Sequence, residues 1–406
     1  MAFTRQIMSI LLFAALLIAL PSLRGGAAAA DGQSEQPPNA FTWYDKAGQM
    51  VDGEARDQLG RWEKLSHKEK RSLLAKLSPV LATVREGMHY PCCMPRINSF
   101  DEKMPWLPNG RNLARLFALE SDVLATDSHY AQATTSGLDA IYLGRDYSSR
   151  SMLIGHLVGI AMQAIGRKSL WTALLRLDAP AARQAAKRLE DISSHPASYA
   201  EVLQEEKHVG MAVLQEFLDH PESFRQLLLE EDGNKLNVSN DLVRALYRPL
   251  IEDALQDYPK HVDAAIATIQ TPYPHWETLP ESKNLLTKIF MPDYRKAGFR
   301  SLENDALNRL LYVGYALHAY QLEHGQYPET LSSLCPDYLT AIPSDPFADA
   351  QPLKYRRTKT GYLLYSIGPD ARDDGGKAVE DTKDKEKRFH IMFDSRGDIV
   401  AGVNID

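Results

Sequence analysis

The sequence predicts a mainly α-helical N-terminal domain, an irregular helical bundle or α-hairpin array, followed by a C-terminal α+β domain. From about residue 42 to residue 290, apolar side chains recur at helical spacing in one segment after another. No fixed period links these segments, which is why the expected array is irregular rather than a regular repeat. After Gly325 the pattern changes to Pro- and Gly-rich turns between short runs of Tyr, Leu and Ile, which is typical of strands.

The first thirty residues have the pattern of an export signal. Arg5 precedes an apolar run over residues 7–20, and residues 27–30 are alanines that suit cleavage. A spanning helix needs about twenty apolar residues, so this run is short for one. We therefore expect an exported, periplasmic or extracellular protein without a stable membrane span after cleavage. The alternative is an uncleaved N-terminal anchor. Residues 31–41 are polar and Pro-rich, as in a flexible linker.

The net charge bears on whether the chain binds nucleic acid, and the cysteines bear on whether it forms a disulfide bond. The chain has 406 residues and a formal net charge of -7, which argues against a nucleic-acid partner because no basic surplus offsets phosphates. Cys92 and Cys93 are adjacent and Cys335 lies far away. In an oxidising compartment, Cys335 could pair with one of the two. Three unpaired, partly buried thiols are the alternative.

The C-terminal domain, residues 300–406, is expected to place one long helix on a small antiparallel sheet. Polar capping residues near 301–305 mark the start of the helix, and Gly325 marks its end. Residues 353–357 and 362–366 flank a Gly-containing turn and predict one hairpin. Residues 389–393 and 399–403 predict a second one.

A series of short motifs runs through this domain in a fixed order. It comprises Gly325, Tyr327 and Pro328; Tyr338 and Leu339; Pro343, Asp345, Pro346 and Phe347; Tyr355; and Ser366, Gly368, Asp370, Gly375 and Gly376. On these residues, the segment resembles the C-terminal domain of the major pseudopilins of type II secretion systems. The resemblance implies a structural calcium ion in the acidic loop, with Asp370, Asp373 and Asp374 as ligands and Asp381 as a further candidate. Clustered carboxylates on a flexible loop suit calcium, although a solvated acidic turn is the alternative.

The resemblance covers about the last quarter of the chain. Residues 2–6 (AFTRQ) lack the Gly and the Glu that begin a pseudopilin, and about 270 residues separate the apolar run from the C-terminal domain. Filament assembly is therefore not implied. The helical part contains residues 114–133 (ARLFALESDVLATDSHYAQA) and 153–165 (LIGHLVGIAMQAI). On these segments it is similar to a group of exported bacterial proteins common in planctomycete-like genomes, and the resemblance implies no activity.

Possible metal chemistry in the helical domain is sparse. Glu205 and His208 form one E-x-x-H pair, whereas di-metal bundles use two such pairs. His89 lies near Cys92 and Cys93 in a Pro-rich loop that could offer zinc ligands. We interpret His156, on an apolar helix, as a hydrogen-bonded core histidine. Gly155 and Gly159 on the same helix predict the close approach of a neighbouring helix.

The leading hypothesis is an exported, non-enzymatic protein that binds a protein partner or scaffolds an assembly. An exported metal-dependent enzyme and a genuine secretion-system or pilus component are the alternatives.

Overall fold

The computed structural model describes residues 38–97, 102–220, 240–381 and 388–404. The predicted export signal, residues 1–30, lies outside these ranges, as does most of the predicted linker. The helices are α2 (Ala40–Gln49), α3 (Gly53–Gly60), α4 (His67–Gly87), α5 (Trp106–Thr126), α6 (Tyr130–Ser148), α7 (Leu153–Leu174), α8 (Ala179–Ser194), α9 (Tyr199–Asp219), α11 (Asn240–Ile269), α12 (Leu285–Phe290) and α13 (Tyr294–His324). Short 3₁₀ turns occur at Trp62–Lys64, Tyr273–His275 and Leu331–Leu334. The strands are β1 (Lys354–Arg357), β2 (Tyr362–Ser366) and β3 (Ile399–Val400). The described chain is thus mainly helical with a small sheet near its C-terminus, as predicted.

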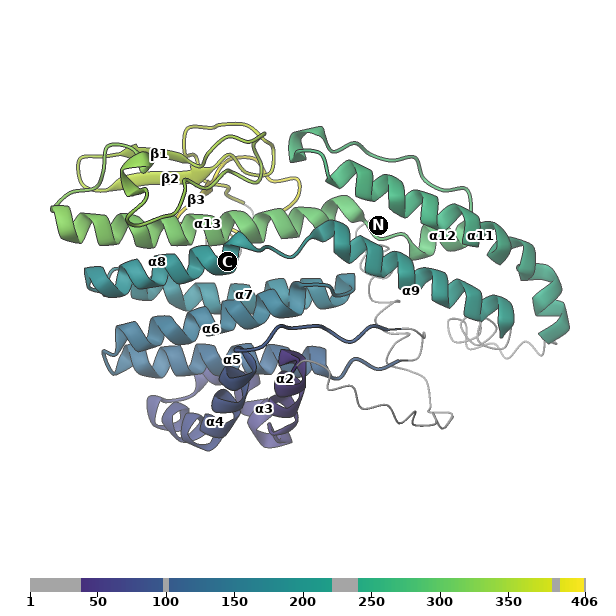
Figure 1. The fold of residues 1–406 in the computed structure, drawn as a ribbon, viewed down its shortest axis with the longest axis horizontal. Coiled ribbons are helices and arrows are strands. Elements are labelled where there is room, and N and C mark those ends of the chain that lie inside the picture. Colours follow the sequence, from purple (N-terminus) through teal and green to yellow (C-terminus); the bar gives the residue numbers. More distant parts are fainter. Residues whose placement is uncertain (1–37, 98–101, 221–239, 382–387, 405–406) are drawn as a thin grey trace.

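The elements are stacked in layers (Figure 1). The sheet covers one side of α13, and α8 and α7 lie on the other side, followed by α6, α5 and the group α2–α4. One hydrophobic core runs from the sheet through α13 into α6, α7 and α8. Helices α9, α11 and α12 extend to one side and enclose a core of their own; we call them the arm.

Helix α13 is buried along most of its length, between the sheet and the helical layers. Its first turn is capped by Asp293, which accepts a hydrogen bond from Lys296 N at 3.1 Å. The helix therefore starts several residues before the predicted start at 301–305. It ends at Gly325, as predicted, and this residue adopts the left-handed conformation with φ 74°. Residues such as Leu310, Val313 and Leu317 are fully buried. They belong to one hydrophobic core with residues of the sheet and of the helical layers, so α13 packs against both.

The sheet has the order β1-β2-β3 and is antiparallel throughout. The predicted hairpin of β1 and β2 is confirmed, with Lys354 opposite Tyr365 and Arg357 opposite Tyr362. The second predicted hairpin is wrong, because residues 389–393 do not form a strand.

In residues 389–393, backbone carbonyls accept hydrogen bonds from side chains rather than from a neighbouring strand. Asn404 Nδ2 donates to Phe389 O at 2.9 Å, and Arg300 donates to Ile391 O at 2.9 Å. These bonds satisfy carbonyls that a strand would have paired, and Ile391 itself is fully buried in the core.

Glycines allow α6 and α7 to pack closely. A Cβ at Gly159 would lie 2.4 Å from Gly144 O, and one at Gly166 would lie 2.6 Å from Gly137 O. The close approach predicted at Gly159 is confirmed. At Gly155 a Cβ would instead meet Ser151 Oγ of the preceding turn at 1.9 Å, so this glycine is needed locally.

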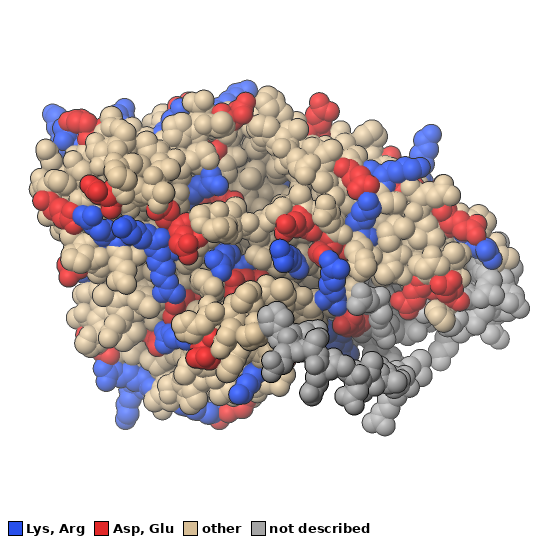
Figure 2. Space-filling model, viewed as in Figure 1, with Lys and Arg blue, Asp and Glu red and all other residues tan. Residues whose placement is uncertain are grey.

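Opposite charges are interspersed over the face shown in Figure 2, where Lys and Arg alternate with Asp and Glu. Ion pairs of partly exposed arginines with one buried carboxylate also join the layers: Asp139 of α6 pairs with Arg85 of α4 at 2.8 Å and with Arg188 of α8 at 2.5 Å. Cys92, Cys93 and Cys335 are free thiols.

Over the described residues, no helix has both the length and the apolar character that crossing a membrane requires.

Candidate functional site

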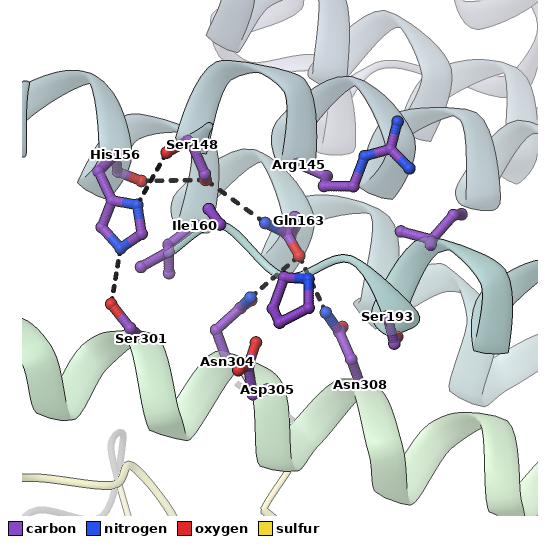
Figure 3. Close-up of a pocket in the computed structure, with 13 residues that line it drawn as sticks. Arg145, Ser148, His156, Ile160, Gln163, Ser193, Ser301, Asn304, Asp305 and Asn308 are labelled. Carbon is purple, nitrogen blue, oxygen red and sulfur yellow. Dashed lines mark hydrogen bonds between the residues drawn. The ribbon is translucent and has the colours of Figure 1, made fainter. Parts of the chain in front are cut away.

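A small cavity lies between α7, α13 and the segment that joins α8 to α9 (Figure 3). Its polar lining comes mainly from α7 and α13, and it includes His156, Gln163, Asn304, Asp305 and Asn308. The cavity has a volume of about 20 Å³, which is room for about one or two water molecules. These groups are therefore close together, but the space between them is small.

His156 bridges three elements in the cavity wall. Its Nε2 lies 2.6 Å from Ser301 Oγ on α13, and its Nδ1 lies 3.0 Å from Ser148 O at the end of α6. Both ring nitrogens are therefore engaged, and the side chain is buried. Burial lowers the pKa of His156 to about 4, so the ring is neutral at physiological pH. The interpretation of a hydrogen-bonded core histidine is confirmed.

Three amides line the cavity, and a buried arginine donates hydrogen bonds to two of them. Gln163 Oε1 accepts hydrogen bonds from Asn304 Nδ2 at 3.0 Å and from Asn308 Nδ2 at 2.9 Å. Both asparagine Oδ1 atoms accept from Arg167, each at 2.8 Å. Arg167 is only 2% exposed, and burial lowers its pKa to about 10. Figure 3 shows the three amides converging between the two helices. The three amides and Arg167 Nη1 are thus bonded to one another, whereas the buried Arg167 Nε and Ser193 Oγ have no hydrogen-bond partner among the described residues.

Asp305 brings a carboxylate to the same cavity. Burial raises its pKa to about 6, against the opposing effects of Arg309 and Arg167. Arg309 donates instead to Ser344 O at 2.8 Å, beneath the sheet. Asp305 is therefore the carboxylic acid among the residues that line this cavity, and the histidine of the same lining is neutral.

The predicted calcium ligands lie on the loop after β2. Asp373 Oδ1 accepts from Tyr365 Oη at 2.9 Å and from Gly375 N at 3.0 Å, and these bonds lower its pKa. Asp370 accepts from Arg372 N at 3.3 Å, and the side chain of Asp374 is exposed. Asp381 lies farther along, where its N–H donates to Arg388 O at 2.6 Å.

Two further aspartates organise this region, and the calcium prediction did not include them. Asp398 is fully buried and accepts from Gly376 N at 2.7 Å and from Asp374 N at 3.3 Å. Asp345 is buried and accepts from Ser366 Oγ at 2.7 Å and from Ile367 N at 2.8 Å. Burial raises the pKa of both carboxyls. Asp345 stood in the Pro-x-Asp-Pro motif, whereas Asp398 had only its position after Gly397 as a signal.

The other candidate metal ligands are engaged elsewhere. Glu205 pairs with Arg96 at 2.8 Å, and His208 also has an interaction partner. Burial strongly raises the pKa of the Cys92 thiol, which favours the protonated form over the thiolate that zinc requires. Across the described ranges, no group of three or more His, Cys, Asp or Glu residues is arranged to hold a metal ion. Calcium at the four aspartates stays a prediction.

Comparison of the chain with models of protein families, with curated protein sequences and with solved structures finds no match.

Proposed function

We propose that this chain is an exported, non-enzymatic protein that binds a protein partner or scaffolds an assembly. The observation that carries this proposal is that the buried polar side chains of α7 form hydrogen bonds with α13. His156, Gln163 and Arg167 are tied to α13 by hydrogen bonds of 2.6–3.0 Å, and the cavity beside them has a volume of about 20 Å³. A drug-sized ligand needs a pocket of about 300 Å³ or more, so these groups serve to fix helices rather than to hold a substrate.

The position of α13 supports a scaffold over a filament subunit. The side of α13 that carries Asn304, Asn308 and Tyr315 is occupied by α7, because Tyr315 Oη donates to Leu170 O at 2.8 Å. The opposite side supports the sheet, where Phe299 packs against Phe347 with ring centroids 5.8 Å apart. Neither side is left open for a neighbouring subunit.

The C-terminal unit is proposed to be pseudopilin-like and to take one structural calcium ion in its acidic loop, at Asp370, Asp373 and Asp374. Gly375 and Gly376 have φ 72° and 88°, so the loop curls in a way that favours glycine. The charges of Asp373 and Asp374 also raise the pKa of the buried Asp398 carboxyl. A cation would relieve this repulsion, and carboxylate oxygens suit calcium.

Thermal unfolding with excess chelator and then with millimolar calcium tests the metal. We expect calcium to raise the melting midpoint, and Asp373→Ala combined with Asp374→Ala to abolish the increase. Asp394→Ala, which changes an exposed aspartate of the same domain, should leave the response intact. Overlapping curves for the unmodified protein would contradict the calcium site.

Export has a separate test. Mass spectrometry of the protein recovered from the periplasmic or extracellular fraction should give an N-terminus near Asp31. Retention of residues 1–30 in the membrane fraction would favour the uncleaved anchor instead.

A further inference from the structure

A buried acid lies where the arm meets the rest of the molecule. Glu206 of α9 is 7% exposed, and its Oε1 accepts a hydrogen bond of 2.6 Å from the backbone N–H of Leu153. Leu153 is the first residue of α7, and Met152 at the N-cap position provides no side-chain cap. Glu206 therefore caps α7 from another helix, which joins the arm to the helical layers.

No basic side chain balances this acid among the residues that the structure describes. Arg96, in the loop before α5, pairs with the neighbouring Glu205 at 2.8 Å. From α11, Tyr258 Oη donates to the backbone oxygen of Glu206 at 3.0 Å rather than to its carboxylate. A charged Glu206 is thus buried with one backbone N–H as its hydrogen-bond donor.

Tyr199 contributes a second unsatisfied group at this joint. Its side chain is 8% exposed, and its buried Oη has no hydrogen-bond partner. The charge of Glu206, and to a lesser extent that of Asp293 at the start of α13, adds to burial in raising the pKa of the Tyr199 phenol. His156 of α7 faces the Tyr199 ring with centroids 5.9 Å apart, but both of its nitrogens are bonded elsewhere.

We propose that this joint is a proton-linked contact, in which Glu206 takes up a proton from solvent near neutral pH and the arm is held more tightly in the protonated form. A neutral carboxyl removes the buried charge. The neutral carboxyl keeps the bond from Leu153 N through Oε1. Burial raises the pKa of Glu206 to about 7, which agrees with this placement of the transition.

Hydrogen exchange measured by mass spectrometry tests the contact in the full chain. A carboxyl with a pKa of about 7 when closed and 4.5 when exposed gives about tenfold more opening at pH 8 than at pH 6. After correction for intrinsic exchange rates, we expect peptides from α9 to lose about tenfold in protection between these pH values. Peptides from α4, whose buried residues belong to a different core cluster from those of the joint, should change much less.

Variants distinguish protonation of Glu206 from general effects of pH on hydrogen exchange. Glu206→Gln keeps an acceptor for Leu153 N without a charge, so protection of α9 should become independent of pH. Glu205→Gln, the matched control, should retain the tenfold change. Equal protection of α9 at both pH values, or a tenfold change that persists in Glu206→Gln, would overturn the proposal.

Discussion

The carboxylate of Asp398 accepts a hydrogen bond of 2.7 Å from the backbone N–H of Gly376. This bond, together with the one from Asp374 N, ties the acidic loop to the end of the chain next to β3. The Asp398 carboxylate therefore fixes the loop that carries the predicted calcium ligands, whether or not a calcium ion is bound there.

Replacing Asp398 should destabilise the loop and the sheet beside it. Asp398→Ala leaves two backbone N–H groups without their acceptor, which should cost about 2 kcal/mol of unfolding free energy. Urea unfolding measures this loss. Asp394→Ala, four residues earlier and exposed, should change the free energy of unfolding by less than about 0.5 kcal/mol. Equal stability of the two variants would show that Asp398 does not hold the loop.

Arg167 should be among the most sensitive positions in the interior. Arg167→Met keeps much of the apolar volume but leaves the Oδ1 atoms of Asn304 and Asn308 without their donor. We expect a loss of about 3 kcal/mol, as for breaking a buried polar network. The exposed Arg176 provides the control: Arg176→Met should be nearly neutral in the same urea unfolding experiment. A small effect at Arg167 would mean that the asparagines find other donors.

Close packing of α6 and α7 should make Gly159 intolerant of a side chain. A Cβ there would lie 2.4 Å from Gly144 O and 2.6 Å from Ser148 N, and both are backbone atoms that cannot rotate away. Gly159→Ala should therefore destabilise by about 2 kcal/mol or more, measured by thermal unfolding. Gly53→Ala should be neutral or slightly stabilising, because nothing lies within 4 Å of its Cβ and alanine suits a helix.

His156 should make the folded protein lose stability in acid. Its pKa falls from 6.5 to about 4 on folding, so between these values the unfolded chain binds a proton that the folded chain does not. Stability from this group is complete above pH 6.5 and is lost as the pH falls towards 4.

The size of this effect can be measured by urea unfolding at pH 7 and pH 5. The unmodified protein should lose about 2 kcal/mol more than His156→Gln between these pH values. Comparison with the variant is needed because Glu206 and Asp305, whose pKa values are raised, contribute the opposite sign. His195→Gln, at an exposed site, should follow the unmodified protein. Parallel pH profiles for His156→Gln and the unmodified protein would contradict the assignment.

Local signals predicted much of the secondary structure. The end of α13 at Gly325 and the hairpin of β1 and β2 depend on residues a few positions apart, so both were visible in the sequence. The start of α13 was misplaced, because the capping role of Asp293 lay outside the region that the apolar pattern marked. The second hairpin failed because Arg300 and Asn404, distant in sequence, take the carbonyls of residues 389–391.

The candidate sites show the same division between local and distant interactions. The acidic loop was visible because its aspartates are clustered in sequence, whereas Asp398, which holds that loop, was not. The E-x-x-H spacing drew attention to Glu205, yet its neighbour Glu206 is the buried acid. Which of two adjacent glutamates faces inward depends on how α9 is rotated against α7, and helical spacing alone does not define that rotation.

The sequence by itself determined a mainly helical chain with a small C-terminal antiparallel sheet, because periodicity, glycines and prolines act over a few residues. Only the tertiary structure decided how α7 and α13 are paired. That pairing brings His156 to Ser301 and Arg167 to Asn304 and Asn308, across about 140 residues of chain. The physical reason is that a buried polar side chain must find its partner in space, and no local pattern records which distant helix provides it.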